Sequence, residues 1–244
     1  VVLQGVLGGL TVLYLLPAPV SVAHGVLAQS FLLLAVFLAY TFSHERGRRI
    51  RDGVDRSVPS LARWAFLATA AVWIQLVLGA IMRHTESGLA IPDFPTMGGR
   101  WLPLFDAEMI TWINGWRIDH TFESGTFLPD VTLGQVAIHA AHRLFAIVVI
   151  VAILRLVRVA WCVRQLNPAA ARSAVCAGML LFIQVALGAA TVLTAKQPLV
   201  TSLHVAVGAA LLALSWLCAL EAFPDELRLG PLSNSTAEAR VPRT

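Results

Sequence analysis

Six blocks of apolar residues, separated by short charged or proline-containing stretches, limit most strongly what this chain can fold into. Inside a bilayer only helices and closed barrels satisfy every backbone polar group, and an apolar helix of roughly 20 residues spans the hydrocarbon core. Charged residues make up 13% of the chain and gather between the blocks. The pattern predicts an all-α fold, a polytopic membrane helical bundle. The net charge of +4 therefore indicates topology, and we expect no nucleic-acid partner.

We expect transmembrane helices at residues 1–16, 21–42, 64–83, 133–156, 174–194 and 201–222. The first is shorter than a usual span, which suggests that the chain begins inside a helix. Arginines gather in loop 43–63 and in loop 155–172, whereas loop 84–132 is rich in Asp and Glu. The positive-inside rule puts the two arginine loops in the cytoplasm and the long loop outside. The polar tail 223–244 is expected to be disordered.

The outer loop contains apolar and aromatic residues at helical spacing, namely Phe105, Met109, Trp112, Ile113 and Trp116. This spacing favours a short helix that lies in the membrane interface, with its tryptophans at headgroup depth. A collapsed loop with a few buried aromatic side chains explains the spacing equally well. Both alternatives stay open at the level of the sequence.

An internal repeat relates the first two spans to the last two. Gln4-Gly-Val-Leu-Gly-Gly-Leu-Thr-Val-Leu reappears as Gln184-Val-Ala-Leu-Gly-Ala-Ala-Thr-Val-Leu, and His24 and His204 each follow their glutamine by 20 residues. Gln75 opens a related segment in the third span. The repeat predicts that residues 1–42 are the last two helices of an N-terminal half, whose first two helices precede Val1. Residues 64–222 would be the complete C-terminal four-helix half.

Histidines inside apolar helices are the candidate functional residues. His139 and His142 share a helical face, Arg143 follows directly, and ionisable groups at membrane depth are costly enough to indicate function. Imidazoles on two helices of a bundle can ligate the two faces of one haem, so we expect His142 and His204 to be an axial pair. His139 would support them, and Arg143 would bind a haem propionate. The alternative is a core histidine bonded to a backbone carbonyl.

The run Arg83-His84-Thr85-Glu86-Ser87-Gly88-Leu89-Ala90-Ile91-Pro92-Asp93-Phe94-Pro95, followed by His139-x-x-His142-Arg143, resembles the haem A synthase family. The resemblance covers about residues 1–222. It implies eight helices in two similar halves, each with a histidine pair for one haem. His142 and His204 would then hold a resident haem b, and His24 would belong to the site that oxidises haem O. The resemblance also implies that His139, Arg143 and Arg83 bind the cofactor.

Two features of the family are absent from this sequence. The glutamate that precedes the N-terminal histidine by three residues is missing together with that histidine, and His139 takes the equivalent position in the C-terminal half. The loop cysteine pair of some bacterial members is also missing. Because half of the implied oxidation site lies outside this sequence, we expect the chain alone to be inactive.

The resemblance implies an oxidoreductase, haem A synthase, which converts a haem O methyl group into the formyl group of haem A by stepwise hydroxylation for cytochrome oxidase. Its implied partners are haem O and haem A, membrane lipid, an unidentified electron donor, haem O synthase and further copies of the same chain. The implied location is a bacterial plasma membrane rather than a mitochondrial inner membrane.

Two other functions remain possible from the residues alone. The first is a bis-histidine haem b cytochrome that transfers electrons in the membrane and would use His142 and His204 as ligands. Iron with two protein ligands is closed to O₂, so ligation by two histidines by itself favours this electron carrier. A transporter built from repeats would need acidic or polar substrate-binding groups inside the membrane, and the spans contain almost none.

Overall fold

The computed structural model describes residues 1–15, 17–52, 56–124 and 129–223, and over these residues every regular element is helical. The elements are α1 (Val2–Leu13), α2 (Ala18–Thr41), α3 (His44–Asp52), α4 (Pro59–His84), the 3₁₀ helix η1 (Ser87–Leu89), α5 (Ala107–Ser124), α6 (Leu133–Cys162), α7 (Pro168–Leu193) and α8 (Pro198–Ala222). Five helices in this part of the chain, α2, α4, α6, α7 and α8, are long and apolar enough to cross a membrane. The predicted polytopic helical bundle is confirmed, although α1 is too short to count as a sixth span.

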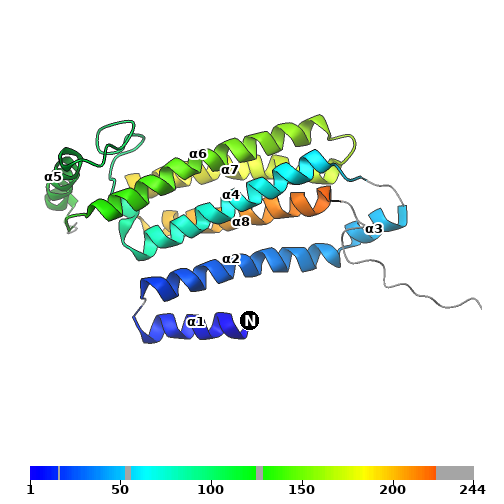
Figure 1. Cartoon of the computed structure of the whole chain (residues 1–244), viewed down its shortest axis with the longest axis horizontal. Helices are drawn as coiled ribbons and strands as arrows, with labels where there is room; N and C mark the ends of the chain where they lie inside the picture. The colour runs from blue at the N-terminus through cyan, green and yellow to red at the C-terminus, as the bar shows by residue number, and fades with distance from the viewer. Residues whose placement is uncertain (16, 53–55, 125–128, 224–244) are drawn as a thin grey trace, which may run out of the picture.

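Helices α4, α6, α7 and α8 form a four-helix bundle. Its neighbours in space are α4 with α6, α6 with α7, α7 with α8, and α8 with α4, so α6 and α8 lie on one diagonal. Helices α1 and α2 pair with each other, and α2 packs against both α4 and α8. Figure 1 shows this pair alongside the bundle, with α5 at one end of the molecule and α3 at the other. The end that carries α5 is the outer end in the predicted topology.

The helix starts follow from local sequence. Four of the long helices, α2, α4, α7 and α8, have a proline at their first or second position, where its fixed φ suits a helix and its missing N–H costs nothing. Helix α6 instead begins with a capping box, in which Thr132 and Gln135 exchange side-chain and backbone hydrogen bonds. Gln135 also donates to the carbonyl of Thr85 over 3.1 Å, which ties the start of α6 to the end of α4.

Hydrogen bonds to one carbonyl close the inner end of the bundle. The carbonyl of Glu221, in the last turn of α8, accepts from Nδ2 of Asn167 at 2.8 Å and from a guanidinium nitrogen of Arg49 at 2.7 Å. Asn167 also donates to the carbonyl of Arg56 over 2.9 Å, and its Oδ1 caps α7. The last carbonyls of a helix lack partners within the helix, so these contacts satisfy α8 while joining α3 and α7 to it.

The packed core fills only the inner half of the bundle. It is rich in alanine and lies within residues 61–72 of α4, 149–160 of α6, 170–181 of α7 and 211–222 of α8. Nearer the outer end no residue is buried in the described segments 73–84, 141–148, 182–193 and 198–207. These segments lie between this core and a second buried cluster at the outer end, which includes Ile91, Met109 and Val136.

The internal repeat is visible in the backbone. Helices α1 and α7 end at Leu13 and Leu193, and the turns that follow place Leu15 at φ 53° and Ala195 at φ 50°. The next helices, α2 and α8, begin at residues 18 and 198. Every one of these landmarks recurs 180 positions later, so the two helix pairs share one backbone design.

The structure differs from the expected elements in two places. Helix α3 lies inside the expected loop 43–63, and a strongly charged segment of this kind gives no hydropathy signal. Helix α6 continues past the expected end at residue 156 to Cys162, and the guanidinium of Arg155 stacks on the Trp64 ring with 5.2 Å to its centroid. Of the two alternatives left open for the outer loop, the structure has the helix, α5. The tail from residue 224 onward lies outside the described residues.

Candidate functional site

His142 is held by two residues of the neighbouring helix α4. The amide nitrogen of Gln75 lies 2.9 Å from the His142 carbonyl oxygen and 3.2 Å and 3.3 Å from its two ring nitrogens. One helical turn later, Gly79 faces the ring, and a Cβ at that position would lie 3.3 Å from Cε1 of the imidazole. The imidazole therefore occupies a niche between an amide group and a backbone without a side chain.

The same niche recurs in the two helix pairs of the internal repeat. In the pair α7–α8, the amide nitrogen of Gln184 lies 3.5 Å from Nε2 of His204, and a Cβ on Gly188 would lie 3.1 Å from Cε1 of that ring. The pair α1–α2 repeats both distances with Gln4, Gly8 and His24. We call this arrangement of a glutamine, a glycine four residues later and a histidine on the neighbouring helix the Gln–Gly niche.

His142 and His204 face the same interior space. They lie on α6 and α8, the diagonal helices of the bundle. Each histidine is in the part of its helix nearer the outer end, where the helix begins. Both belong to the outer segments in which no residue is buried, and their imidazoles are close enough to interact electrostatically. His24 lies on α2, in the helix pair alongside the bundle, at the position that the repeat makes equivalent to His204.

Several polar atoms at this level are buried without a hydrogen-bond partner. They include Oε1 of Gln4, Gln75 and Gln184 and Nδ1 of His24 and His204. Leaving a buried polar group unpaired costs on the order of 1–3 kcal/mol. Five such atoms gathered at the Gln–Gly niches indicate sites that are completed by a ligand.

The composition of the site fits a haem better than a bare metal ion. A bare zinc ion takes about four ligands, and the described residues contain no group of three or more His, Cys, Asp or Glu side chains that could hold one. Haem iron already has its porphyrin nitrogens and needs only axial ligands such as imidazole. His142 and His204, placed on the diagonal helices of the bundle, offer two such imidazoles.

His139 and Arg143 support the segment between α4 and α5, residues 85–106, which closes the outer end and is called the closing loop below. His139 is only 2% exposed, and its Nδ1 accepts the backbone N–H of Ile91 over 3.1 Å. Its Nε2 lies 3.0 Å from Nε of Arg143. The other guanidinium nitrogens of Arg143 donate to the carbonyls of Ile91 at 2.9 Å, Asp93 at 2.7 Å and Thr96 at 3.0 Å. This geometry supports the expected accessory role of His139, and the expected propionate contact of Arg143 stays a prediction.

The closing loop is itself stabilised by Asp93. Its two carboxylate oxygens accept the backbone N–H groups of Gly98 at 2.8 Å and Gly99 at 2.9 Å, and both glycines have positive φ. Burial alone would raise the pKa of Asp93, but hydrogen bonds from Thr96, Gly99 and Gly98 outweigh burial and lower the pKa below its ordinary value of 3.8. A Cβ on Gly98 would lie 2.8 Å from Cγ of Met109, so this turn also needs glycine to pack on α5.

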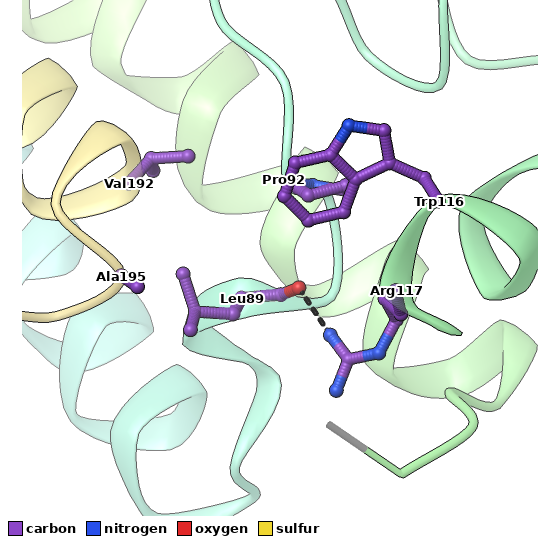
Figure 2. A pocket seen from close by; sticks show the side chains of 6 residues that line it. All are labelled: Leu89, Pro92, Trp116, Arg117, Val192 and Ala195. Carbon is purple, nitrogen blue, oxygen red and sulfur yellow. Dashed lines mark hydrogen bonds between the residues drawn. The ribbon is translucent and has the colours of Figure 1, made fainter. Parts of the chain in front are cut away.

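A small cavity lies above the bundle, between the closing loop, α5 and the end of α7. Its volume is about 30 Å³, and Figure 2 shows its lining by Leu89, Pro92, Trp116, Arg117, Val192 and Ala195. Arg117 donates to the carbonyl of Leu89 over 2.6 Å, which fastens α5 to the loop. The cavity has room for about one water molecule and is too small for a cofactor.

The remaining candidates fall at the edges of this arrangement. Arg83 is exposed at the outer end of α4, and the contact with a cofactor expected for it stays a prediction. The glutamines of the Gln–Gly niches are the residues that sequence reasoning missed. Their repeated position, 20 residues before a histidine in two of three cases, was the available signal.

Comparison with known proteins adds relatives to this geometry. A family model described as cytochrome oxidase assembly protein (COX15-CtaA) matches residues 1–216. A heme A synthase of Rhizorhabdus wittichii is 27% identical over 212 residues, which cover 86% of this chain and 55% of that protein. A heme A synthase of Caulobacter vibrioides is 30% identical over 152 residues, which cover 62% of this chain and 40% of that protein. The chain thus spans about half the length of these relatives. No solved structure matches significantly.

Proposed function

Because the chain belongs to the COX15-CtaA family of cytochrome oxidase assembly proteins, we propose that it functions in haem A synthesis, as an oxidoreductase that converts a methyl group of haem O into a formyl group. Two relatives carry the name heme A synthase, which supports this substrate and product. Both relatives are bacterial, and five helices could cross a membrane, so we place the protein in a bacterial plasma membrane.

One observation carries the proposal for the resident cofactor. His142 and His204 lie on the diagonal helices α6 and α8, next to Gln75 and Gln184, whose Oε1 atoms are buried without a hydrogen-bond partner. In this proposal the imidazoles of His142 and His204 would hold haem b. A haem bound there would supply redox chemistry, and the protein would supply the axial ligands, the orientation and a site shielded from water.

Each of the other groups has a proposed task. His24 presents an imidazole to haem O at the second site, because its Gln–Gly niche repeats the one around His204. His139 and Arg143 hold the loop 91–96 across the outer end of the bundle and so keep bulk water from the resident haem. Stepwise hydroxylation of the methyl group, an external electron donor, haem O synthase as a partner and assembly of several copies are further parts of this proposal.

The test is the pigment that the purified membrane protein contains. The full chain is produced in a host that makes haem O, and its haems are extracted and identified by chromatography and mass spectrometry. We expect haem b with haem O. His142→Ala and His204→Ala should lose haem b, whereas His24→Ala should lose haem O while keeping haem b. His44→Ala, on the exposed surface of α3, is the matched control.

A bis-histidine electron carrier is the second candidate, because imidazoles on both faces of one iron leave no position for O₂. The same extraction separates the two functions. Haem b alone, in a host that contains haem O, supports the carrier. Retention of the full haem content after both His142→Ala and His204→Ala would contradict both candidates.

A further inference from the structure

We propose that the Gln–Gly niche is a positioning device for haem ligands, in which Gln75 with Gly79 and Gln184 with Gly188 fix the place and rotation of the imidazoles of His142 and His204. This inference rests on the proposed function only in taking these two histidines as the ligands of the resident haem.

The recurrence of the niche indicates that it accompanies the histidine and does not follow from the way the two helices are connected. Helices α1 and α2, and helices α7 and α8, are joined by tight turns of identical design, so their likeness follows from the repeat. Helices α4 and α6 are joined in a different way, through the long segment 85–132, and Gln75 and His142 are 67 positions apart. A glutamine amide and a glycine face the histidine ring there nevertheless. The common factor is the histidine, and the way the helices are connected does not produce the niche.

The glutamine contributes an anchored amide group. In the α4–α6 pair the Gln75 amide donates to the backbone carbonyl of His142 over 2.9 Å, and Gln4 makes the equivalent contact with the His24 carbonyl over 3.3 Å. With one N–H held by the backbone, the amide nitrogen is kept beside the ring of the same histidine, at 3.2 Å and 3.3 Å from the His142 nitrogens. The amide thereby restricts rotation of the imidazole relative to its own helix.

The glycine contributes space. A Cβ at Gly79 or Gly188 would lie 3.3 Å or 3.1 Å from Cε1 of the ring, which is closer than most real Cβ contacts. The neighbouring helix therefore forms a wall against which the ring rests. Gly208, one turn after His204, provides similar room for the amide, since its Cβ would lie 3.0 Å from Nε2 of Gln184.

The glutamine side chain also provides a hydrogen-bond acceptor, its Oε1, that has no partner among the described residues. Oε1 of Gln75 and of Gln184 is buried without a partner, and so is Nδ1 of His204. A histidine that ligates a metal through one nitrogen usually donates the N–H of the other nitrogen to an oxygen, and this contact sets ligand orientation and basicity. The pair Gln184 and His204 thus contains both the acceptor and the ring nitrogen that such an arrangement requires.

The experiment uses the full chain, purified with its haem. Gln75→Met and Gln184→Met remove the amide and keep the side-chain length, while Gly79→Ala and Gly188→Ala push on the ring. The matched control is Gly9→Ala, since a Cβ at Gly9 meets nothing within 4 Å. The readouts are haem content, the low-spin electron paramagnetic resonance spectrum, the midpoint potential and the rate of haem transfer to apomyoglobin.

We expect the four variants to bind haem with shifted g-values and a shifted midpoint potential, and to hold it about 10- to 100-fold less tightly, as found when partners of metal ligands are removed. Gly9→Ala should match the unmodified protein in all four readouts. A purely structural role would lower the yield of protein and leave the spectrum of the bound haem unchanged. If Gly79→Ala and Gly188→Ala do not accumulate in the membrane, the same four readouts on the two methionine variants decide the outcome.

The outcomes separate this inference from the proposed function. Loss of haem in His142→Ala and His204→Ala, together with unchanged spectra and affinity in the glutamine and glycine variants, would overturn the positioning role alone. Unchanged haem in the histidine variants would overturn the haem ligation on which both proposals depend.

Discussion

Ile91 donates its backbone N–H to Nδ1 of His139 over 3.1 Å, so a histidine deep in helix α6 is bound to the loop that closes the outer end. Nε2 of the same ring faces Arg143 at 3.0 Å. The His139 ring is therefore enclosed by Ile91 and Arg143, in contrast to the His204 ring, whose Nδ1 is unpaired. This difference distinguishes a histidine that organises the closing loop from one that is available to a ligand.

His139→Ala should consequently loosen the loop and spare the resident haem. The substitution leaves the Ile91 N–H without its acceptor, at a cost of about 1–3 kcal/mol, and removes the ring that lies between Ile91 and the Arg143 guanidinium. We expect faster hydrogen exchange at residues 91–96, measured by mass spectrometry, and a haem content close to that of the unmodified protein. Haem loss as complete as in His142→Ala would show instead that His139 is itself a ligand.

Asp93 makes the stability of the closing loop depend on pH. Its pKa is lower in the folded protein than its ordinary value of 3.8, because the hydrogen bonds from Thr96, Gly99 and Gly98 outweigh burial. A group with a lowered folded pKa contributes stability above its unfolded pKa and loses it as the pH falls through the folded value. We expect no change in the hydrogen exchange of residues 93–99 from pH 8 to about 5, and faster exchange below about 4, relative to intrinsic rates.

The control for this pH dependence is Asp93→Asn, which cannot titrate. Exchange in residues 93–99 should be faster than in the unmodified protein at neutral pH, and its protection should no longer change in the acid range. A protection that rises on acidification in the unmodified protein would contradict the stated direction of the pKa shift.

Asn167 can be tested by separating its two roles. Asn167→Asp keeps the oxygen that caps α7 and loses the Nδ2 donor to the carbonyls of Arg56 and Glu221, whereas Asn167→Ala loses both. An N-cap is worth about 0.5–2 kcal/mol, and each lost hydrogen bond about 0.5–1.5 kcal/mol. We expect both variants to lower the thermal unfolding midpoint in detergent, with aspartate the more damaging, because its second carboxylate oxygen would face two carbonyl oxygens at a buried position. Equal midpoints for Asn167→Ala and the unmodified protein would refute the closing role of this residue.

Ala195 offers a stabilising substitution. It sits at φ 50°, and this left-handed conformation costs a residue with a Cβ on the order of 1 kcal/mol, which glycine avoids. We expect Ala195→Gly to raise the unfolding midpoint slightly. Thr194→Gly, at φ −99°, is the control and should lower it, since glycine there adds freedom to the unfolded chain and loses the hydrogen bond from the Thr194 hydroxyl to the Ala190 carbonyl at 2.7 Å. A lower midpoint for Ala195→Gly would mean that its methyl group makes a contact worth more than the strain.

The helical spans could be predicted because hydropathy alone determines which segments lie in a membrane. The ends of the spans could not, since they depend on partners distant in sequence. Helix α6 reaches Cys162 with Arg155 lying over Trp64, and this contact joins residues of two helices. Helix α3 has no apolar block to reveal it, and its Arg49 bonds to the far end of α8.

The candidate ligands could be identified from the repeat, but their surroundings could not. In the sequence the glutamines mark only the start of the repeated segments. That Gln75 meets His142 across 67 positions follows only from the pairing of α4 with α6. The acceptors of Arg143 were likewise hidden, because three of them are backbone carbonyls, which every residue type possesses.

The unequal packing of the bundle has a consequence for turnover of the protein in the cell. The alanine-rich inner half holds the helices together with protein contacts alone, whereas no residue is buried in the segments 141–148 and 198–207 that carry His142 and His204. A ligand that binds only the folded state adds stability by mass action, about 2.7 kcal/mol at a hundredfold excess over its Kd. With haem as that ligand, haem supply would set how long the outer half survives membrane proteases, and the amount of this protein would follow the amount of its cofactor.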